Sequence, residues 1–307
     1  MIALDGSHLE IADVVSVARK HELVILSDES KAKMHESEQV VMDLLHSGKT
    51  VYGVNTGFGS LSTEKISEKD VESLQVNLLR SHSCGVGDPL PVDVVRAMML
   101  LRANSLAKGY SGIRSGVVQL LLDMLNNKIH PLVPRKGSIG ASGDLVPLAH
   151  IGLCLIGEGT VVFDGEKISS AEAFQKTGLE PVCLQAKEGL ALINGSQLMG
   201  ALGCLFVSDA KQLLKHAQIA GILSLEALKG TNLAFRKEIH KLRPHSGQVK
   251  CAENLWKLSQ HSKIHESHLD CGKVQDAYTL RCMPQVFGAS RDVFSYVEHV
   301  LEIEINS

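Results

Sequence analysis

The chain has 307 residues, of which 44% are hydrophobic and 21% are charged, and its net charge is −3. These values are typical of a globular chain of one or two domains that can bury a core without a disulfide or a structural metal. The scattered, slightly acidic charge argues against nucleic-acid partners and against a polybasic membrane patch. The seven cysteines are an odd number with no C-x-x-C pair, which favours a reduced, cytoplasmic protein, and the first ten residues lack the pattern of a signal peptide.

Helical patterns predominate along the chain. Aromatic residues make up only 4% of it, whereas Leu, Ala and Val are abundant, a composition typical of helices packed on helices. In chain order, the apolar spacing predicts helices at 92–108, 112–127 and 144–157, a long helix at 189–230, and a last helix at 285–304. Between the third and the fourth, residues 160–168 predict a small β-hairpin, because Asp164 and Gly165 suit a tight primed turn.

The long pattern at 189–230 determines the expected architecture. It contains no proline and is apolar on several faces, so we expect a central helix that a bundle buries on all sides. Its most apolar part, 191–207, includes Asn194, Ser196 and Gln197, and therefore we expect no membrane span. The sequence predicts a mainly α fold, in which a mixed N-terminal region with loops and a small hairpin precedes a long-helix bundle.

Two short patterns resemble binding motifs but are better explained by local structure. Gly48-Lys49-Thr50 looks like the end of a phosphate-binding loop, yet the glycine required five residues earlier is Asp43, so a helix C-cap is favoured. His261, His265 and His268 have helical spacing, but they do not form H-E-x-x-H, and their surroundings are polar. We therefore expect neither a nucleotide site nor a metal site.

The segment Lys136–His150, KGSIGASGDLVPLAH, carries the chemistry. Its simplest interpretation is a glycine-rich turn that leads into a helix, with Ser142 or Asp144 as the N-cap and Pro147 in the first turn. That interpretation does not explain why residues 141–143 are so small at a point where a helix dipole offers partial positive charge. Gly-Ala-Ser-Gly also differs from the Gly-x-Ser-x-Gly nucleophile elbow, so a hydrolase triad is unsupported.

The segment resembles the signature of the aromatic amino acid ammonia-lyases. Four further segments resemble motifs of the same family, in the family's order: Tyr52–Gly59, Asn77–Gly87, Glu188–Gln197 and Val274–Gln285. The resemblance implies that the Ala141-Ser142-Gly143 tripeptide cyclises autocatalytically into 4-methylidene-imidazol-5-one. In that reaction the Gly143 nitrogen attacks the Ala141 carbonyl carbon, whose oxygen leaves as water, and Ser142 then loses its hydroxyl as a second water. The small side chains suit so tight a backbone turn.

The resemblance is strongest to the histidine-specific members, and it implies removal of ammonia from L-histidine to give trans-urocanate. Ser81 and His82 carry this distinction, because members that use tyrosine or phenylalanine have His-Leu or Phe-Leu there. The alternatives are a tyrosine or phenylalanine ammonia-lyase or an aminomutase, and, from another class, an inactive N-terminal fragment or an assembly subunit. Whether the ring engages the substrate amine or its imidazole stays open.

The resemblance also implies roles for single residues. In the family's pattern Tyr52 is the base, His82 contacts the substrate imidazole, and Arg281 binds the substrate carboxylate. Asn194, which we expect to be a buried amide, Gln275 and Tyr278 correspond to residues that orient the substrate or stabilise the ring. Each also has an ordinary structural interpretation, such as a hydrogen bond within the bundle for Asn194. The family needs no metal or nucleotide and assembles as a homotetramer.

The resemblance covers the N-terminal three-fifths of the family's chain. This sequence ends at Ser307, where the family continues into a Thr-Asp-Asn-Pro segment and a large helical part that supplies a glutamate and a phenylalanine to the site. We expect residues 1–188 to form an active-site domain with the prosthetic-group loop, and residues 189–307 to form the start of the central helical bundle.

Overall fold

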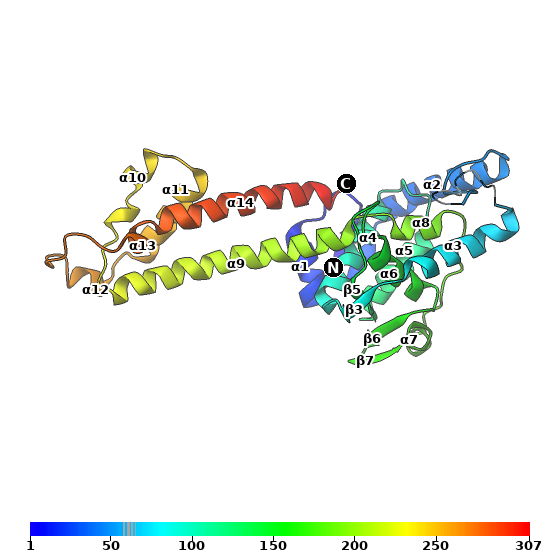
Figure 1. Ribbon diagram of the computed structural model, residues 1–307, viewed down its shortest axis with the longest axis horizontal. Coiled ribbons are helices and arrows are strands. Elements are labelled where there is room, and N and C mark those ends of the chain that lie inside the picture. Colours follow the sequence, from blue (N-terminus) through cyan, green and yellow to red (C-terminus); the bar gives the residue numbers. More distant parts are fainter. Residues whose placement is uncertain (58, 60–61, 63, 65) are drawn as a thin grey trace. The chain divides into compact units, whose positions relative to one another are not determined.

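A computed structural model describes residues 1–57, 59, 62, 64 and 66–307. The chain divides into two compact units. Unit 1 consists of Met1–Leu205 and Leu301–Ser307, and unit 2 consists of Phe206–Val300. Helices dominate both units, as the sequence predicts, and the few strands are short (Figure 1).

Unit 1 places short strands between helices. Its elements in chain order are β1 (Ile2–Leu4), α1 (Ile11–Lys20), β2 (Val24–Leu26), α2 (Asp28–His46), α3 (Glu68–His82), β3 (Val86–Pro89), α4 (Val92–Ala107), α5 (Ser115–Asn126), β4 (His130–Pro131), β5 (Pro134–Lys136), α6 (Leu145–Leu155), β6 (Thr160–Phe163), β7 (Glu166–Ser169), α7 (Ser170–Thr177), α8 (Glu188–Ile193) and the start of α9 (Gln197–Ala227).

Helix α4 forms the centre of unit 1. Nearly every residue from Val94 to Ala107 is buried, including Arg96 and Arg102, so this helix is covered on all sides. Helices α1 and α5 pack on it, and α6 and α8 complete the core. A helix that is apolar all round is typical of a core position. The other elements, and the loops that carry the motifs, are arranged around α4.

Three small sheets lie among the helices of unit 1. Strand β1 pairs with β2 in parallel, β3 pairs with β5 antiparallel, and β4, β6 and β7 form a three-stranded antiparallel sheet. Strands β6 and β7 form the predicted hairpin, with Asp164 and Gly165 at φ values of 50° and 83°. Positive φ at both central residues is the geometry of a type I′ turn, so the hairpin prediction is confirmed.

Unit 2 contains the rest of α9 and the helices that follow it. These are η2 (Leu233–Phe235), α10 (Lys237–Lys241), α11 (Ser246–Leu258), α12 (Lys263–Glu266), α13 (Tyr278–Arg281) and α14 (Met283–Glu304), whose last turn belongs to unit 1. Its core is small: Ile222, Leu225, Phe235, Leu255, Leu280 and Met283 pack together.

The predicted helix at 189–230 is two helices, so that expectation was wrong. The chain leaves the helical conformation at Asn194, whose φ is −87° and ψ is 95°, and α9 begins three residues later. Within this chain α9 is not covered on all sides, since Phe206, Leu213 and Leu223 are 61%, 68% and 64% exposed, so its burial in a bundle stays a prediction. The helices predicted at 92–108, 112–127, 144–157 and 285–304 are confirmed as α4, α5, α6 and α14.

Length and composition alone would allow one stretch, Glu188–Ala227, to cross a membrane. Half of its most apolar window is buried inside the protein, as in the core helix of a globular chain. The break at Asn194 also divides the stretch into two separate helices.

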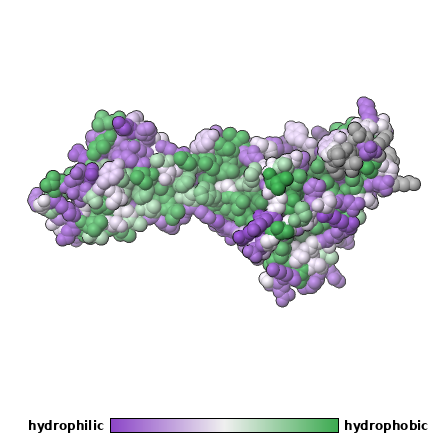
Figure 2. All heavy atoms as spheres, in the orientation of Figure 1, coloured by the Kyte–Doolittle hydropathy of each residue, from purple (hydrophilic) through white to green (hydrophobic). Residues whose placement is uncertain are grey.

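The exposed apolar residues of α9 and α14 follow heptad spacing. In unit 2, alternating steps of four and three residues connect Phe206, Leu213, Ala220, Leu223 and Ala227 along α9, with Asp209 and His216 at the two intervening positions. The same spacing connects Val286, Ala289, Val293, Tyr296 and Val300 along α14. Apolar side chains are visible along both helices in Figure 2. Such seams are typical of helices that pack against further helices.

Candidate active site

The Ala141-Ser142-Gly143 tripeptide forms a tight turn between β5 and α6. Ser142 and Gly143 have positive φ values of 59° and 96°, and Gly140 has a φ of 73°. Positive φ is uncommon for a residue with a side chain such as Ser142. Gly140 and Gly143 pair across the turn as an isolated antiparallel bridge, and Ala141 and Ser142 are exposed at its tip. The turn therefore presents Ser142 at the surface of this chain on a sharply bent backbone.

Gly143 lies directly against Gly195, which follows α8. A Cβ atom at Gly143 would stand 2.3 Å from the Gly195 carbonyl oxygen, a contact that no side chain can make. The backbone N–H of Asp144 donates a hydrogen bond to the same oxygen at 2.7 Å. The third residue of the tripeptide must therefore be glycine in this structure, and the bend is held by the segment between α8 and α9.

The Asp144 carboxylate connects the tripeptide loop to α9. It is 1% exposed; Oδ2 accepts hydrogen bonds from the backbone N–H groups of Leu198 and Met199 at 2.9 and 3.0 Å, and Oδ1 accepts one from the Ser138 hydroxyl at 2.7 Å. The first N–H groups of a helix lack partners within it, and a negative charge there is favourable. The sequence allowed either Ser142 or Asp144 as the N-cap of α6, and Asp144 occupies that position. Its carboxylate, however, accepts hydrogen bonds from the first N–H groups of α9 and not from α6.

Asn194 ends α8, and Arg102 holds this end. The Arg102 Nη1 donates to the Asn194 carbonyl at 3.1 Å and to the Gln197 Oε1 at 2.9 Å, and its Nη2 donates to the Ala191 carbonyl. The Asn194 side chain is exposed, so the expectation of a buried amide was wrong. The side chain is exposed because the chain breaks between the two helices at this point, which turns residue 194 out of the apolar core.

The start of α8 is fixed as firmly as its end. The buried Gln75 of α3 accepts hydrogen bonds from the N–H groups of Gly189 and Leu190 at 3.0 and 3.3 Å. Glu188 is 1% exposed and forms a two-pronged ion pair with Arg114, at 2.8 and 2.7 Å. The hydrogen bond to Glu188 raises the pKa of Arg114. Helix α8 is thus anchored to α3 and to the residues before α5.

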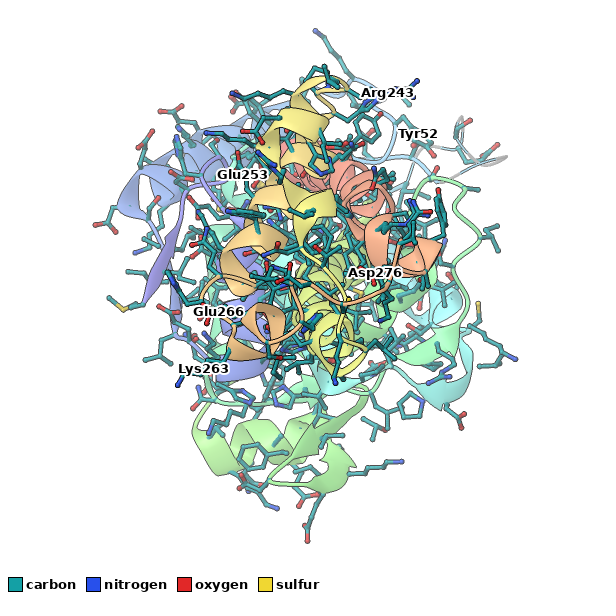
Figure 3. The ribbon with its side chains drawn as sticks, turned by 90° about the vertical axis from the view of Figure 1, so that its left-hand side faces the viewer. Tyr52, Arg243, Glu253, Lys263, Glu266 and Asp276 are labelled. Carbon is teal, nitrogen blue, oxygen red and sulfur yellow. The ribbon has the colours of Figure 1, made fainter. Side chains whose placement is uncertain are left out.

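The turn that carries Tyr52 also reaches α8. Asn55 accepts a hydrogen bond from the Val51 N–H at 2.8 Å, and the Thr56 hydroxyl accepts one from the Gly53 N–H at 3.2 Å. Gly53 has a φ of 75°, and a Cβ there would stand 2.8 Å from the side chain of Leu190. Tyr52 itself is 58% exposed (Figure 3). Phe58, in the same motif, lies outside the described residues.

His82 is the last residue of α3 rather than part of a loop. Its Nδ1 lies 2.9 Å from the Leu78 carbonyl oxygen and 3.1 Å from the Ser81 hydroxyl. Because a carbonyl oxygen only accepts, the neutral ring carries its proton on Nδ1, and Nε2 remains an acceptor. Three residues on, Gly85 lies against Gly137 of the tripeptide loop, since a Cβ at Gly137 would stand 3.3 Å from the Gly85 Cα.

The residues expected near the C-terminus lie together in unit 2, in and before α13. The Arg281 Nε donates to the Asp276 carbonyl at 3.0 Å, and its guanidinium carbon stands 5.6 Å from the centre of the Tyr278 ring. Tyr278 is 72% exposed, and Gln275 is also exposed. The Asp276 carboxylate fixes this segment, because it accepts a hydrogen bond from the Thr231 N–H at 2.7 Å (Figure 3).

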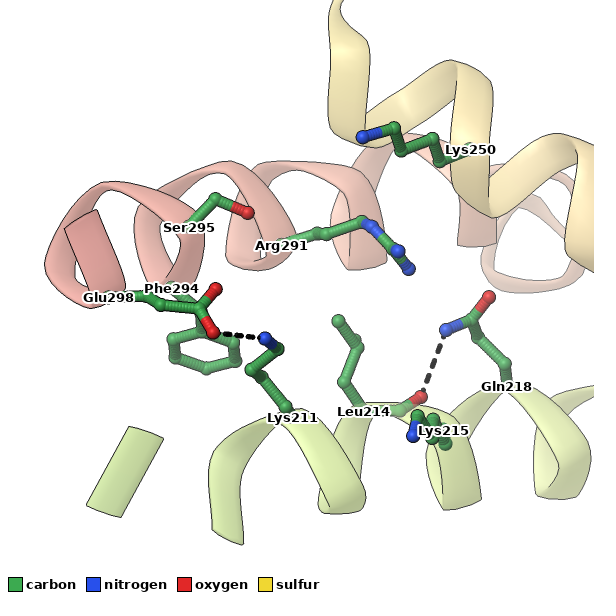
Figure 4. Close-up of a pocket in the computed structure, with 9 residues that line it drawn as sticks. All are labelled: Lys211, Leu214, Lys215, Gln218, Lys250, Arg291, Phe294, Ser295 and Glu298. Carbon is green, nitrogen blue, oxygen red and sulfur yellow. Dashed lines mark hydrogen bonds and ion pairs between the residues drawn. The ribbon is translucent and has the colours of Figure 1, made fainter. Parts of the chain in front are cut away.

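Several cavities lie beside the basic residues of unit 2, and one of about 580 Å³ is lined by Arg236, Lys237 and Trp256, among others. Two smaller ones lie nearer the residues of the C-terminal motif and α14. One of about 220 Å³ is lined by Gln275, Asp276, His265 and His268, among others. Another of about 250 Å³ contains none of the motif residues; it is lined by Lys211, Leu214, Lys215, Gln218, Lys250, Arg291, Phe294, Ser295 and Glu298, of which Lys211 and Glu298 form an ion pair (Figure 4). Among the residues that the structure describes, no three His, Cys, Asp or Glu side chains are placed to hold a metal ion.

Unit 1 thus brings four of the five motifs together around α8 and the tripeptide turn. The residues that make these connections, Gln75, Arg102 and Asp144, were not identified as site residues from the sequence. A signal existed for Asp144, a lone charge directly before an apolar helical run, whereas Arg102 shares its run with Arg96 and does not stand out. Their partners lie 54 to 95 residues away, however, and local patterns do not reveal such contacts.

Known proteins resemble the chain over its whole length. The sequence pattern of the family described as "Aromatic amino acid lyase" matches residues 9–307. A histidine ammonia-lyase from Caldanaerobacter subterraneus subsp. tengcongensis is 50% identical over 306 residues, which are 100% of this chain and 60% of the relative. The chain therefore spans about 60% of the length of the curated relatives it matches.

Two solved structures show the same fold. Ergothionase from Treponema denticola, an ergothioneine-degrading enzyme, superposes with a TM-score of 0.94 at 33% identity, over 100% of this chain and 61% of that chain. Histidine ammonia-lyase from Trypanosoma cruzi superposes with a TM-score of 0.89 at 37% identity, over 100% of this chain and 57% of that chain.

Proposed function

Because the chain belongs to the aromatic amino acid lyase family, we propose that it contributes to the elimination of ammonia from L-histidine, which gives trans-urocanate. One observation carries the proposal: the Ala141-Ser142-Gly143 turn is bent through positive φ values and packed against Gly195, as an internal cyclisation requires. Curated relatives near 50% identity that are named histidine ammonia-lyase support the choice of substrate.

The tripeptide fits a ring formed from its own backbone, 4-methylidene-imidazol-5-one. Gly143 has no room for a Cβ, and Ser142 is exposed, so that its hydroxyl can leave. The hydrogen bond from the Asp144 N–H to the Gly195 carbonyl fixes the end of the turn that follows Gly143. This group, when formed, supplies an electrophile of the kind that cofactors bring to reactions with weakly acidic protons. Formation needs no metal or nucleotide.

The residues of unit 1 would bind and deprotonate the substrate. Tyr52 stands on a glycine-containing turn beside α8, where its phenolate oxygen would take the proton from the substrate β-carbon and become the neutral phenol. The free Nε2 of His82 would accept a hydrogen bond from the N–H of the substrate imidazole, because its Nδ1 already donates to the Leu78 carbonyl. The exposed amide of Asn194 would hold the substrate or the ring.

The residues of unit 2 would bind the other end of the amino acid. Arg281 uses its Nε for the Asp276 carbonyl, which leaves the two Nη groups as a fork for the substrate carboxylate. Tyr278 stacks against this guanidinium and would stabilise the ring, and Gln275 would orient the substrate. We propose that residues 1–188 form the active-site domain and that 189–307 begin a central bundle.

We propose a homotetramer as the assembly in which the site is completed. The exposed heptad seams of α9 and α14 support it, because largely apolar seams on long helices are typical of packing against partner helices, although Asp209 and His216 interrupt the seam of α9. The seven cysteines are all free, in keeping with a cytoplasmic enzyme, and we propose no nucleic-acid or membrane partner.

A tyrosine- or phenylalanine-specific lyase or aminomutase is the alternative activity. The polar Ser81 and His82 at the end of α3 disfavour it, since an apolar ring gains nothing from these groups. An inactive assembly subunit is the alternative from another class.

Intact mass of the purified chain tests the prosthetic group. We expect the parent to weigh less than its sequence by two water molecules. Ser142→Ala has no hydroxyl to eliminate, so it should keep at least one of these water molecules while unfolding at the same urea concentration. Production of urocanate, followed by its ultraviolet absorbance, tests the activity. A folded parent at full sequence mass would disprove the ring, and a preparation that carries the ring but converts tyrosine faster than histidine would disprove the substrate.

A further inference from the structure

Arg102 is a buried cation for which the structure shows no acidic partner. Its side chain lies on α4 and is 4% exposed, and burial lowers its pKa to about 10. Within the described part of the chain, no carboxylate pairs with it, and its Nε–H has no acceptor at all. A buried charge without a counter-charge is costly, and an unsatisfied buried N–H adds to that cost. Packing alone would be served better by an apolar residue.

The groups that Arg102 does contact all belong to the break between α8 and α9. Its two Nη groups donate to the carbonyls of Ala191 and Asn194 and to the side-chain oxygen of Gln197. The last carbonyls of a helix have no partner within it, and a cation is favourable at that end. One guanidinium thus closes α8 and fixes the first residue of α9.

Gly195 transmits this position to the tripeptide. A Cβ at Gly195 would stand 2.3 Å from the Arg102 Nη1, and a Cβ at Gly143 would stand 2.3 Å from the Gly195 carbonyl oxygen. Gly195 is therefore enclosed between the guanidinium and the third residue of the turn. The Asp144 N–H donates to the Gly195 oxygen as well, so a shift of the break would shift the turn.

We propose that Arg102 is a positioning residue for the tripeptide: it fixes the Asn194–Gly195 segment as the wall against which residues 141–143 are bent for cyclisation. The effect on cyclisation rests on the proposed function, because it requires that the ring forms. The effect of Arg102 on the position of the break can be tested separately. Arg102 does not contact the tripeptide, so it acts through the residues of the break that it holds, Asn194, Gly195 and Gln197.

The same helix provides a matched control. Arg96, two turns earlier on α4, is 1% exposed, and burial lowers its pKa to about 10 as well. Like Arg102 it donates to backbone carbonyls, here those of Val17 at 3.0 and 2.8 Å and Leu125 at 2.9 Å, which belong to α1 and α5. Arg96→Met therefore removes an equivalent buried guanidinium without touching the break.

The first test compares amide hydrogen exchange in Arg102→Met and Arg96→Met. The reporters are the N–H groups of Asp144, Leu198 and Met199, each expressed relative to global unfolding of the same variant. We expect exchange at these sites to be about tenfold faster in Arg102→Met, the effect of losing one charge-assisted hydrogen bond. Equal protection in the two variants would overturn the proposal. If either methionine variant fails to fold, Arg102→Lys and Arg96→Lys are compared in the same way, because lysine cannot span three acceptors.

The second test measures cyclisation by intact mass on the same preparations. We expect Arg96→Met to lose both water molecules as completely as the parent, and Arg102→Met to retain water in most molecules. Complete cyclisation of Arg102→Met would contradict its role toward the tripeptide. A parent at full mass would instead disprove the proposed ring, while the exchange comparison would still decide whether Arg102 holds the break.

Discussion

His130, the first residue of β4, should make unit 1 sensitive to mild acid. The side chain is 8% exposed, and its Nδ1 has no hydrogen-bond partner within the described part of the chain. Burial lowers the pKa of His130 to about 4, and the charges of Arg96, His21 and Lys128 act in the same direction. The folded protein therefore holds this imidazole neutral at a pH where an unfolded chain would protonate it.

The sign and size of the effect follow from linkage. In the unfolded chain histidine titrates near pH 6.5, so below that pH the unfolded state binds a proton that the folded state excludes. The free energy of unfolding is therefore not reduced by His130 above about pH 7. Below that pH it falls progressively until the pH reaches the folded pKa of about 4. With these two pKa values, the free energy of unfolding should fall by about 2 kcal/mol between pH 7 and pH 5.

Urea unfolding of the parent and His130→Gln at both pH values measures this term. Glutamine does not titrate, so the variant should lose about 2 kcal/mol less than the parent over the interval, whatever its absolute stability. His46→Gln is the matched control, because it removes an exposed imidazole at the end of α2 without changing the core. If the parent and His130→Gln lose the same free energy, His130 is not held neutral by the fold, and the reasoning from its burial is wrong.

Three further changes test the site. Asp144→Ala should lower the free energy of unfolding by about 3–5 kcal/mol, since it leaves buried N–H groups at the start of α9 without an acceptor. A loss below about 1 kcal/mol in urea titrations would show that the carboxylate does not hold α9. Arg281→Ala should raise the KM for histidine by an amount equivalent to about 2–5 kcal/mol, because the carboxylate loses a bidentate partner, and steady-state kinetics with an unchanged KM would remove Arg281 from the site. Replacing Ser81 and His82 by Phe and Leu should shift kcat/KM from histidine toward phenylalanine, since an apolar pocket leaves imidazole groups unpaired at about 1–3 kcal/mol each; an unmoved ratio would show that these residues do not select the substrate.

Features that depend on neighbouring residues could be predicted from the sequence. The hairpin at 160–168 follows from Asp164 and Gly165, which tolerate the positive φ that its turn requires. Helices α4, α5 and α6 follow from apolar spacing within one segment. Helices α1 and α2 could have been found in the same way, since buried Ile11, Val14 and Val17 have helical spacing, and the Ser27 hydroxyl caps α2 by accepting from the Ser30 N–H.

The break between α8 and α9 shows where local patterns fail. Asn194 and Gly195 form a dipeptide typical of turns. The apolar residues on both sides have helical spacing, however, and this spacing predicts one continuous helix. The structure stops the helix there because the Arg102 guanidinium takes the free carbonyls and the Asp144 carboxylate takes the free N–H groups. Arg102 comes from α4 and Asp144 from the loop before α6, so the cost of breaking the helix is offset only in the folded chain.

The same reasoning explains why the tripeptide could be located from the sequence, whereas its bent conformation could not. Small residues at 141–143 permit a tight turn, but glycine and serine occur just as readily in an open loop. The bend exists because the Gly195 oxygen occupies the space where a third side chain would lie and accepts the next N–H. Gly195 can stand there only because Arg102 fixes the residues beside it, from a helix whose sequence pattern indicates nothing but a buried core. The bent turn is thus a product of contacts between segments about 50 to 95 residues apart, each of which is ordinary when taken alone.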